Sequence, residues 1–147
     1  MEEKKSFRIY KANKTGTGSA LGMDMNVEKE AIFLEVANQM GEKRFDWNNK
    51  ITMKLSISDI GNFLAVLRGK KDSIRLFHEP AKGEYELAKE VMNTIAELSK
   101  GAHGYALRVS QQARSRELRA IQINISDDEG EVLRVLLERA IERIHKW

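Results

Sequence analysis

One pattern of nineteen residues occurs twice in the sequence, seventy positions apart. ITMKLSISDIGNFLAVLRG begins at Ile51, and IQINISDDEGEVLRVLLER begins at Ile121. In both copies apolar residues first alternate with polar ones, which predicts a half-buried strand. A serine then stands at the expected helix start (Ser56 or Ser126), with Asp59 or Glu129 three positions later, the spacing of a capping box. Each half of the chain is therefore expected to end in a strand that runs directly into an amphipathic helix.

The remaining segments supply further strands. We expect them at 7–12, 20–26, 31–40 and 51–55 in the first half, and at 73–78, 105–110 and 118–125 in the second. Segment 84–99 is ambiguous, because its apolar residues have helical spacing while the repeat calls for a strand. We expect a short helix to about Met92 and a strand over 93–99. Two strand-rich halves with one helix each predict an α+β fold with two sheets, whose helices cover one face or end.

Length and composition limit the class of protein. A chain of 147 residues is expected to form a single domain over 1–147, with repeats at about 6–70 and 71–147. The chain has no cysteine, which excludes disulfides and thiolate metal sites. No run of about 18 apolar residues is present, and the first ten residues lack the apolar core of a signal peptide. A cytoplasmic, nucleoid-associated protein is the expectation.

The basic charge is concentrated in one stretch. The whole chain has a net charge of +3, and RVSQQARSRELR, from Arg108 to Arg119, has a local net charge of +3 by itself. Clustered arginines of this kind are typical of a surface that binds nucleic acid, where each neutralised phosphate of a single strand adds about 0.7 to the log–log salt slope. The alternative is an ordinary solvated turn.

A second basic stretch is interleaved with aromatic residues. In EKRFDW, Lys43 and Arg44 stand beside Phe45 and Trp47. This pairing suits a single strand, because cations hold phosphates while rings stack on bases. The alternative is a hairpin whose aromatic side chains pack into the core or against another subunit. The two readings stay open for Trp47, and a structural role is favoured for Phe45.

The N-terminal glycine-rich stretch also follows basic and aromatic residues. Tyr10, Lys11 and Lys14 lead into TGTGSALG, where Gly16 and Gly18 allow a close approach of backbone to a bound strand. A nucleotide-binding phosphate loop is not expected, because the glycines are not followed by a helix start or by Gly-Lys-Ser/Thr.

No catalytic or metal site is predicted. His78 and Glu79 have no nucleophile or metal ligand beside them in sequence, and the three histidines lack ligand spacing. We interpret Phe77, His78 and Pro80 as the end of a strand and the turn after it. No cofactor is expected, and the protein is not expected to be an enzyme.

The C-terminal segment has an apolar stripe over 133–144. Such a stripe packs into a core, forms a subunit contact, or does both. Trp147 follows it directly.

Several segments together resemble the Whirly family of single-stranded DNA-binding proteins, which shares its half-unit with the positive-cofactor-four coactivators. The segments that carry the resemblance are GEKRFDWNN (41–49), LSISDIGNFLAV (55–66), KDSIRLFHEP (71–80), GYALRVS (104–110) and RIHKW (143–147). They occur in the family's order and with similar gaps over nearly the whole chain.

The resemblance implies two β-β-β-β-α repeats that form two near-perpendicular antiparallel sheets, with the helices packed at one side. It also implies a homotetrameric ring with the helices inside, and DNA held along the sheets with little sequence preference. One motif departs from the family, because Gly16 and Gly18 stand where its Lys-Gly-Lys motif has lysines. Higher assembly of tetramers is therefore not carried over.

We thus expect a sequence-tolerant single-stranded DNA-binding protein that protects or organises strands in repair, recombination or transcription. Lys54 joins the candidate contacts because it points away from the face of Ile51, Met53 and Leu55. The candidate contacts are Tyr10, Lys11, Lys14, Lys43, Arg44, Trp47, Lys54, Tyr105, Arg108, Arg114 and Arg116. The alternatives are an RNA-binding module on the same fold, a small hydrolase or nuclease, and a purely structural oligomer.

Overall fold

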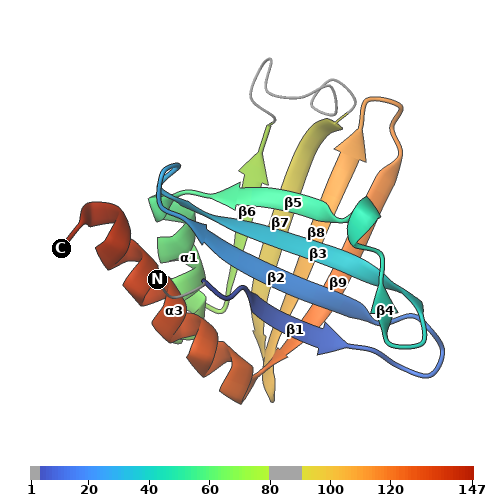
Figure 1. Ribbon diagram of the computed structural model, residues 1–147, viewed down its shortest axis with the longest axis horizontal. Coiled ribbons are helices and arrows are strands. Elements are labelled where there is room, and N and C mark those ends of the chain that lie inside the picture. The colour runs from blue at the N-terminus through green and yellow to red at the C-terminus, as the bar shows by residue number, and fades with distance from the viewer. Residues whose placement is uncertain (1–3, 80–90) are drawn as a thin grey trace.

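The computed structural model describes residues 4–79 and 91–147 and contains two antiparallel sheets that cross one another (Figure 1). The first sheet pairs β1 with β2 and β2 with β3, and β3 also pairs with β4 and β5. The second sheet has the order β6-β7-β8-β9. The strands of the first sheet are β1 (Phe7–Lys11), β2 (Ser19–Asn26), β3 (Ala31–Gly41), β4 (Arg44–Phe45) and β5 (Ile51–Leu55). Those of the second are β6 (Ser73–His78), β7 (Val91–Gly101), β8 (Gly104–Ala113) and β9 (Leu118–Ser126).

The helices lie together at one side of the crossed sheets (Figure 1). A 3-10 turn, η1 (Trp47–Asn49), precedes β5, and α1 (Ile57–Leu67) follows it. The long α3 (Asp127–His145) follows β9. The α+β class, the two sheets and the repeated strand-to-helix pattern predicted from the sequence are thus confirmed. Among the described helices none is both long and apolar enough to cross a bilayer.

The two strand-to-helix junctions have the same capping geometry. The Ser56 hydroxyl accepts a hydrogen bond from the Asp59 amide at 3.3 Å, and the Asp59 carboxylate accepts one from the Ser56 amide at 2.9 Å. Ser126 and Glu129 form the same reciprocal pair at 3.4 and 2.9 Å. Two otherwise unpaired backbone donors are satisfied at each helix start. The capping boxes predicted from the repeat are therefore present.

One segment differs from its predicted structure. The strand expected over 93–99 is part of β7, but β7 already begins at Val91, so the predicted helix does not extend to Met92. Val91 pairs with Ala113 of β8, and this cross-strand pairing outweighs the helical spacing of the apolar residues. The rest of the predicted helix, 84–90, lies outside the described residues. The two-residue β4 and η1 were not expected, because neither has an apolar period to reveal it.

The inner faces of both sheets and the two helices share one apolar core. On β5, Ile51, Met53 and Leu55 are buried while Thr52 and Lys54 are exposed. The helices add Phe63, Leu133 and Leu137, which are almost fully buried. Each such side chain stabilises the fold by about 1.5–3 kcal/mol. The alternation fixes which side chains remain on the outer faces.

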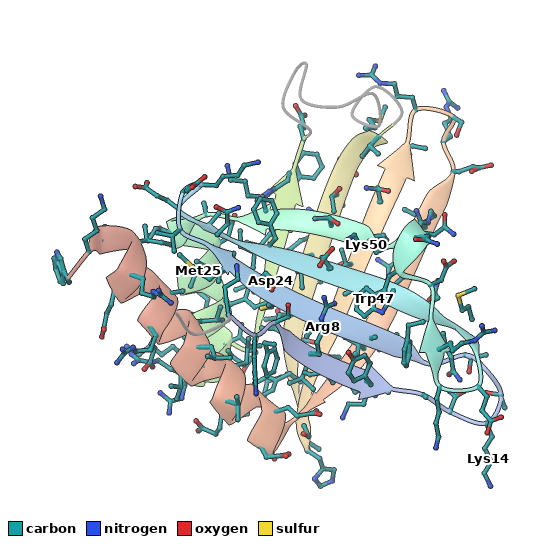
Figure 2. The ribbon with its side chains drawn as sticks, viewed as in Figure 1. Arg8, Lys14, Asp24, Met25, Trp47 and Lys50 are labelled. Carbon is teal, nitrogen blue, oxygen red and sulfur yellow. The ribbon has the colours of Figure 1, made fainter. Side chains whose placement is uncertain are left out.

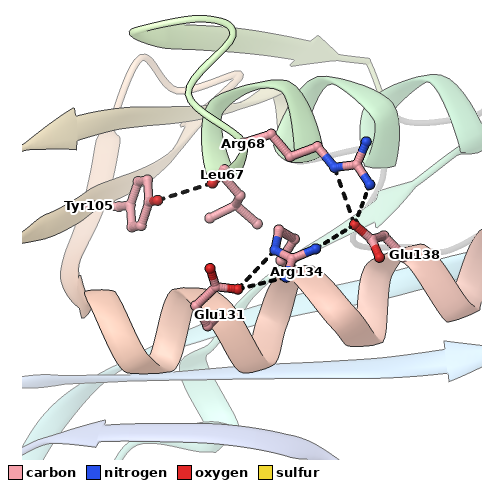
Figure 3. A network of polar contacts seen from close by, with 6 residues as sticks. All are labelled: Leu67, Arg68, Tyr105, Glu131, Arg134 and Glu138. Atoms are coloured by element: carbon pink, nitrogen blue, oxygen red, sulfur yellow. Dashed lines mark hydrogen bonds and ion pairs between the residues drawn. The ribbon is translucent and has the colours of Figure 1, made fainter.

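Ionic contacts join the two helices on top of this core. Arg68, just after α1, donates two hydrogen bonds to Glu138 of α3, at 2.6 and 3.2 Å (Figure 3). Arg134 of α3 binds the same carboxylate at 2.7 Å and Glu131 at 2.8 Å. The hydrogen bond with Arg68 is the main cause of a pKa of Glu138 below the usual carboxyl value. These contacts hold the two repeats in a fixed relation at the side where the helices lie.

Two glycines provide opposite tests of this fold. Gly104 has φ +146°, and an added Cβ would lie 2.1 Å from the Ile125 carbonyl oxygen, whereas Gly61 in α1 has open space around it. We expect Gly104→Ala to lower the free energy of unfolding by at least about 1–3 kcal/mol. Gly61→Ala should raise it by roughly 0.5–1 kcal/mol, since alanine has the higher helix propensity. Urea denaturation at fixed protein concentration measures both, and a Gly104→Ala variant as stable as wild type would contradict the described β8 start.

Candidate nucleic-acid interface

A groove opens on the outer face of the first sheet, where the end of β1 lies beside β4 and η1. Its volume is about 750 Å³. Four candidate contacts from different parts of the chain meet there. The lining residues are Tyr10, Ala12, Met40, Lys43, Arg44, Phe45 and Trp47. Cations and aromatic rings thus share one concave surface, which is the combination that binds unpaired bases and their phosphates.

The aromatic walls of the groove follow from local backbone structure. Tyr10 points outward because its neighbour Ile9 is buried in the core. The chain turns back after β3 with Lys43 at φ +55°, and the Asp46 amide then donates to the Asn38 carbonyl at 2.8 Å. This return places the Phe45 ring 5.5 Å from the Tyr10 ring, tilted by 38°. Phe45 is therefore half-buried yet lines the groove, a contribution that the sequence did not reveal.

Gln39 fixes the loop that carries Lys14. Its amide nitrogen donates to the carbonyls of Asn13 and Gly41, at 3.1 and 3.0 Å. Its carbonyl oxygen accepts from the amides of Asn13 and Gly18, both at 3.0 Å. All four hydrogen-bonding positions of the side chain are used, so the β1–β2 loop is tied firmly to β3. Lys14 projects from the end of this loop (Figure 2). A single buried glutamine gave no signal in the sequence.

Arg8 is a second functional candidate that the sequence did not reveal. Its guanidinium carbon lies 4.4 Å from the centre of the Trp47 ring, within the range of a cation–π contact (Figure 2). Arg8 is paired with Gly22 of β2, and its side chain crosses that glycine. The contact orients the indole at the edge of the groove. Trp47 is thus half-buried on the outer surface and is not part of the core.

Lys54 extends this outer surface away from the groove. It is exposed on β5 and pairs with Phe33 of β3, which in turn pairs with Asp24 of β2. The Lys29 ammonium lies 5.6 Å from the Phe33 ring. A second cation–aromatic pair therefore lies on the same face of the first sheet.

The three other arginines among the candidate contacts belong to the second sheet or to its β8–β9 turn, and they do not line the groove. Arg108 faces outward on β8 and forms an ion pair with Glu97 of β7 at 3.5 Å. Arg114 and Arg116 are exposed in the β8–β9 turn. Phe77, expected to have only a structural role, is half exposed on the same outer face as Arg108. The second sheet thus has a separate basic surface.

Two candidate contacts have partners within the fold. The Tyr105 hydroxyl donates to the Leu67 carbonyl at 3.2 Å on the helix-facing side of β8 (Figure 3). Burial and, after it, the carboxylates of Asp127 and Glu131 raise its pKa. The Lys11 ammonium lies 2.7 Å from the Glu129 carboxylate at the start of α3. The reason is the register, which places both side chains on the inner side of their strands.

The pair formed by Lys11 and Glu129 has an electrostatic consequence. Burial by itself would raise the pKa of the Glu129 carboxyl. The hydrogen bonds from Lys11 and Ser126 outweigh it, so that this pKa is lower than the usual value. The carboxylate form is therefore favoured by the folded structure.

His78 has a structural partner as well. It is the last residue of β6, and its Nε2 lies 3.0 Å from the carboxylate of Asp59, the acidic member of the capping box of α1. Pro80, expected to shape the following turn, lies outside the described residues. Over residues 4–79 and 91–147, no group of three histidine or acidic side chains has a geometry suited to a metal ion.

Comparison with known proteins places this geometry in a family. The model of the Whirly transcription factor family matches residues 9–136. The chloroplastic single-stranded DNA-binding protein WHY1 of Zea mays is 28% identical over 123 residues, which are 82% of this chain and 46% of the maize protein. WHY1 of Solanum tuberosum is 36% identical over 52 residues, 35% of this chain and 18% of the potato protein. The chain thus spans less than half the length of the curated relatives that it matches.

Solved structures show the same fold. WHY3 from Arabidopsis thaliana superposes with a TM-score of 0.79 at 21% identity, covering 100% of this chain and 92% of that chain. The plant transcriptional regulator PBF-2 gives a TM-score of 0.78 at 20% identity, covering 100% and 93%. The crossed sheets with helices at one side are therefore a known arrangement.

The ion pair of Lys11 predicts a pH effect on stability. Because the folded-state pKa of Glu129 is lowered, the pair stabilises the fold above the unfolded pKa of about 4.3, and this contribution is lost as the pH falls through the folded value. Lys11→Met should lower the free energy of unfolding at neutral pH by about 0.5 kcal/mol, since the pair is partly screened by water. The same substitution should also make the free energy of unfolding fall less steeply as the pH is lowered.

Denaturation curves at several pH values measure both effects. Lys14→Met, on the exposed loop three residues further on, is the matched control and should change neither quantity. An unchanged acid dependence in Lys11→Met would contradict a stabilising role for the pair.

Proposed function

The chain belongs to the Whirly family, and from this premise we propose that it binds single-stranded DNA with little sequence preference. The observation that carries the proposal is the groove in which Tyr10, Phe45 and Trp47 lie beside Lys43 and Arg44. The named relatives are single-stranded DNA-binding proteins, which agrees with this chemistry.

The binding mechanism needs unpaired bases. Tyr10, Phe45 and Trp47 offer ring faces to bases, and such faces are accessible only when the bases are not stacked in a duplex. Stacking contributes about 1–3 kcal/mol per base and accepts every base, because each has a π-face. Phosphates are neutralised by cations around the rings and on the neighbouring surfaces. These cations are Lys14, Lys43, Arg44, Lys54, Arg108, Arg114 and Arg116. Lys11 and Tyr105 are left out because they lie on the inner side of their sheets, where they contact Glu129 and Leu67.

The proposed action is mechanical. We infer that the two repeats, about 6–70 and 71–147, act as one domain that keeps strands apart and shields them during repair, recombination or transcription. No step of this function requires catalysis. The cytoplasmic location stays a prediction, and the relatives named above are chloroplastic.

The surface of α3 supports assembly of several copies. Val132, Val135 and Leu136 are about half exposed and have the spacing of a single helix face. Leu133 and Leu137 on the other face are buried in the core. An exposed apolar face on a long helix is typical of a subunit contact. We propose a homotetramer with α3 at its centre.

Removal of the groove tryptophan tests the DNA-binding proposal. We expect Trp47→Ala to weaken binding of oligo-dT by roughly 5- to 150-fold, the loss of one stacked base. Trp147→Ala is the matched control, because Trp147 is 96% exposed beyond α3, and it should leave affinity unchanged. Mobility-shift titration gives both values.

The same titration separates the alternatives. Wild-type protein should bind single-stranded DNA more tightly than a duplex of the same sequence. Equal or tighter binding of a matched RNA would favour an RNA-binding module. Cleavage of labelled DNA in the presence of magnesium would favour a nuclease, and a lack of binding to every oligomer would favour a structural oligomer.

A charged residue on α3 tests the assembly. Leu136→Glu should dissociate the tetramer, because the seam would then have to bury a carboxylate. Size-exclusion chromatography with light scattering should give a lower mass for this variant. Met92→Glu, at the start of β7 and away from the helices, is the control and should retain the wild-type mass. A wild-type mass for Leu136→Glu would exclude α3 as the seam.

A further inference from the structure

The guanidinium of Arg8 has an unusual position for a cation. Its Nη1 atom is buried, and it has no hydrogen-bond partner within the part of the chain that the structure describes. The guanidinium carbon lies 4.4 Å from the centre of the Trp47 ring, and the side chain also passes over Gly22. Buried donors are almost always paired, so this exception calls for an explanation.

The acidic residues on the neighbouring strands do not provide a counterion. Glu35 lies in the same cross-strand row, on the far side of Gly22, and forms an ion pair with Lys50. Asp24, one row away on β2, accepts a hydrogen bond from the Ser6 hydroxyl. Arg8 is therefore a positive charge on the outer face whose neighbouring carboxylates are already engaged.

The sequence nevertheless leaves room for this side chain. A Cβ at Gly22 would lie 2.3 Å from Nη1 and 2.9 Å from the guanidinium carbon, so any larger residue would displace it. An apolar side chain such as methionine would also fill the space over Gly22 and would not bury an unpaired donor. The fold by itself therefore gives no reason for an arginine at this position.

Trp47 is held in a way that permits its side chain to move. The backbone on either side is anchored, since the Asp46 amide donates to Asn38 and Arg119 donates to the Asn49 carbonyl. Between these anchors, η1 has only three residues, and none of them is buried. A rotation of the indole would expose Arg8 without moving the strands.

We propose, on the basis of the single-strand-binding function proposed above, that Arg8 is a concealed phosphate-binding residue and that Trp47 covers it until DNA is bound. On binding, the indole leaves the guanidinium and stacks on a base at the edge of the groove. Nη1 then donates to an oxygen of a phosphodiester. The ring face of Trp47 then contacts a base in place of the guanidinium. Arg8 gains the acceptor that it lacks in the free protein.

The salt dependence of binding tests this role. Arg8→Met keeps an unbranched side chain over Gly22 and removes the charge. We expect it to weaken binding of oligo-dT at low salt by about tenfold, the usual effect of losing one charged hydrogen bond. The log–log salt slope should fall by about 0.7, the value for one phosphate of a single strand. Its melting temperature should equal or exceed that of wild type, because the unpaired buried donor is gone.

Two further variants complete the experiment. Arg8→Lys keeps a charge that can reach a phosphate, so it should retain the wild-type slope. Lys71→Met, exposed in the turn between α1 and β6, removes a positive charge away from the groove and from the proposed α3 seam, and should change neither slope nor affinity. The fluorescence of Trp47 can be measured in a Trp147→Phe background without DNA. Acrylamide should quench it more strongly in Arg8→Met than in wild type, since the indole ring has lost its cationic partner.

The outcomes separate the two proposals. If wild-type protein does not bind oligo-dT, the proposed function itself fails. If wild type binds and Arg8→Met keeps the wild-type slope, Arg8 does not contact a phosphate and only this inference is overturned. A folded Arg8→Met whose slope falls, together with retention by Arg8→Lys, supports it.

Discussion

The shared core between two crossed antiparallel sheets sets the position of the candidate side chains that lie on strands. Strand side chains alternate, so burying Ile51, Met53 and Leu55 leaves Lys54 on the outside. A shift of one residue in the pairing would exchange the two faces. The same rule turns Tyr10 toward the groove and Lys11 toward α3, although the two are neighbours in sequence. The candidate binding surface is thus a consequence of core packing.

On the outer face of the first sheet, small residues lie beneath larger side chains. Its middle rows contain small residues, and Ala20, Gly22 and Ala37 are buried even though they face away from the core. Larger side chains cover them, including Arg8 over Gly22. The return of the chain through β4 and η1 then adds Phe45 and Trp47. Figure 2 shows Trp47 beside Arg8. Small residues beneath and aromatic ones above produce a groove with rings as walls.

The two repeats have the same plan but different surfaces. Each ends in a strand, a serine cap and a helix, and ionic contacts between Arg68, Arg134 and Glu138 join the helices. The groove belongs to the first repeat alone, because the second sheet has no counterpart of β4 and η1 among its described strands. On the second sheet, Arg108 and Phe77 lie on an open face. The two sheets therefore present different outer surfaces.

The sequence alone determined the duplicated strand-to-helix plan, both capping boxes and the basic-aromatic character of 43–47, because these features depend on residues close together in the chain. Only the tertiary structure decided which of them meet. It brought Tyr10 to Phe45, withdrew Lys11 and Tyr105 into contacts with Glu129 and Leu67, and revealed Arg8 beneath Trp47. Such contacts join residues tens of positions apart. Their pairing depends on strand register and on the path of short turns, which no local pattern encodes.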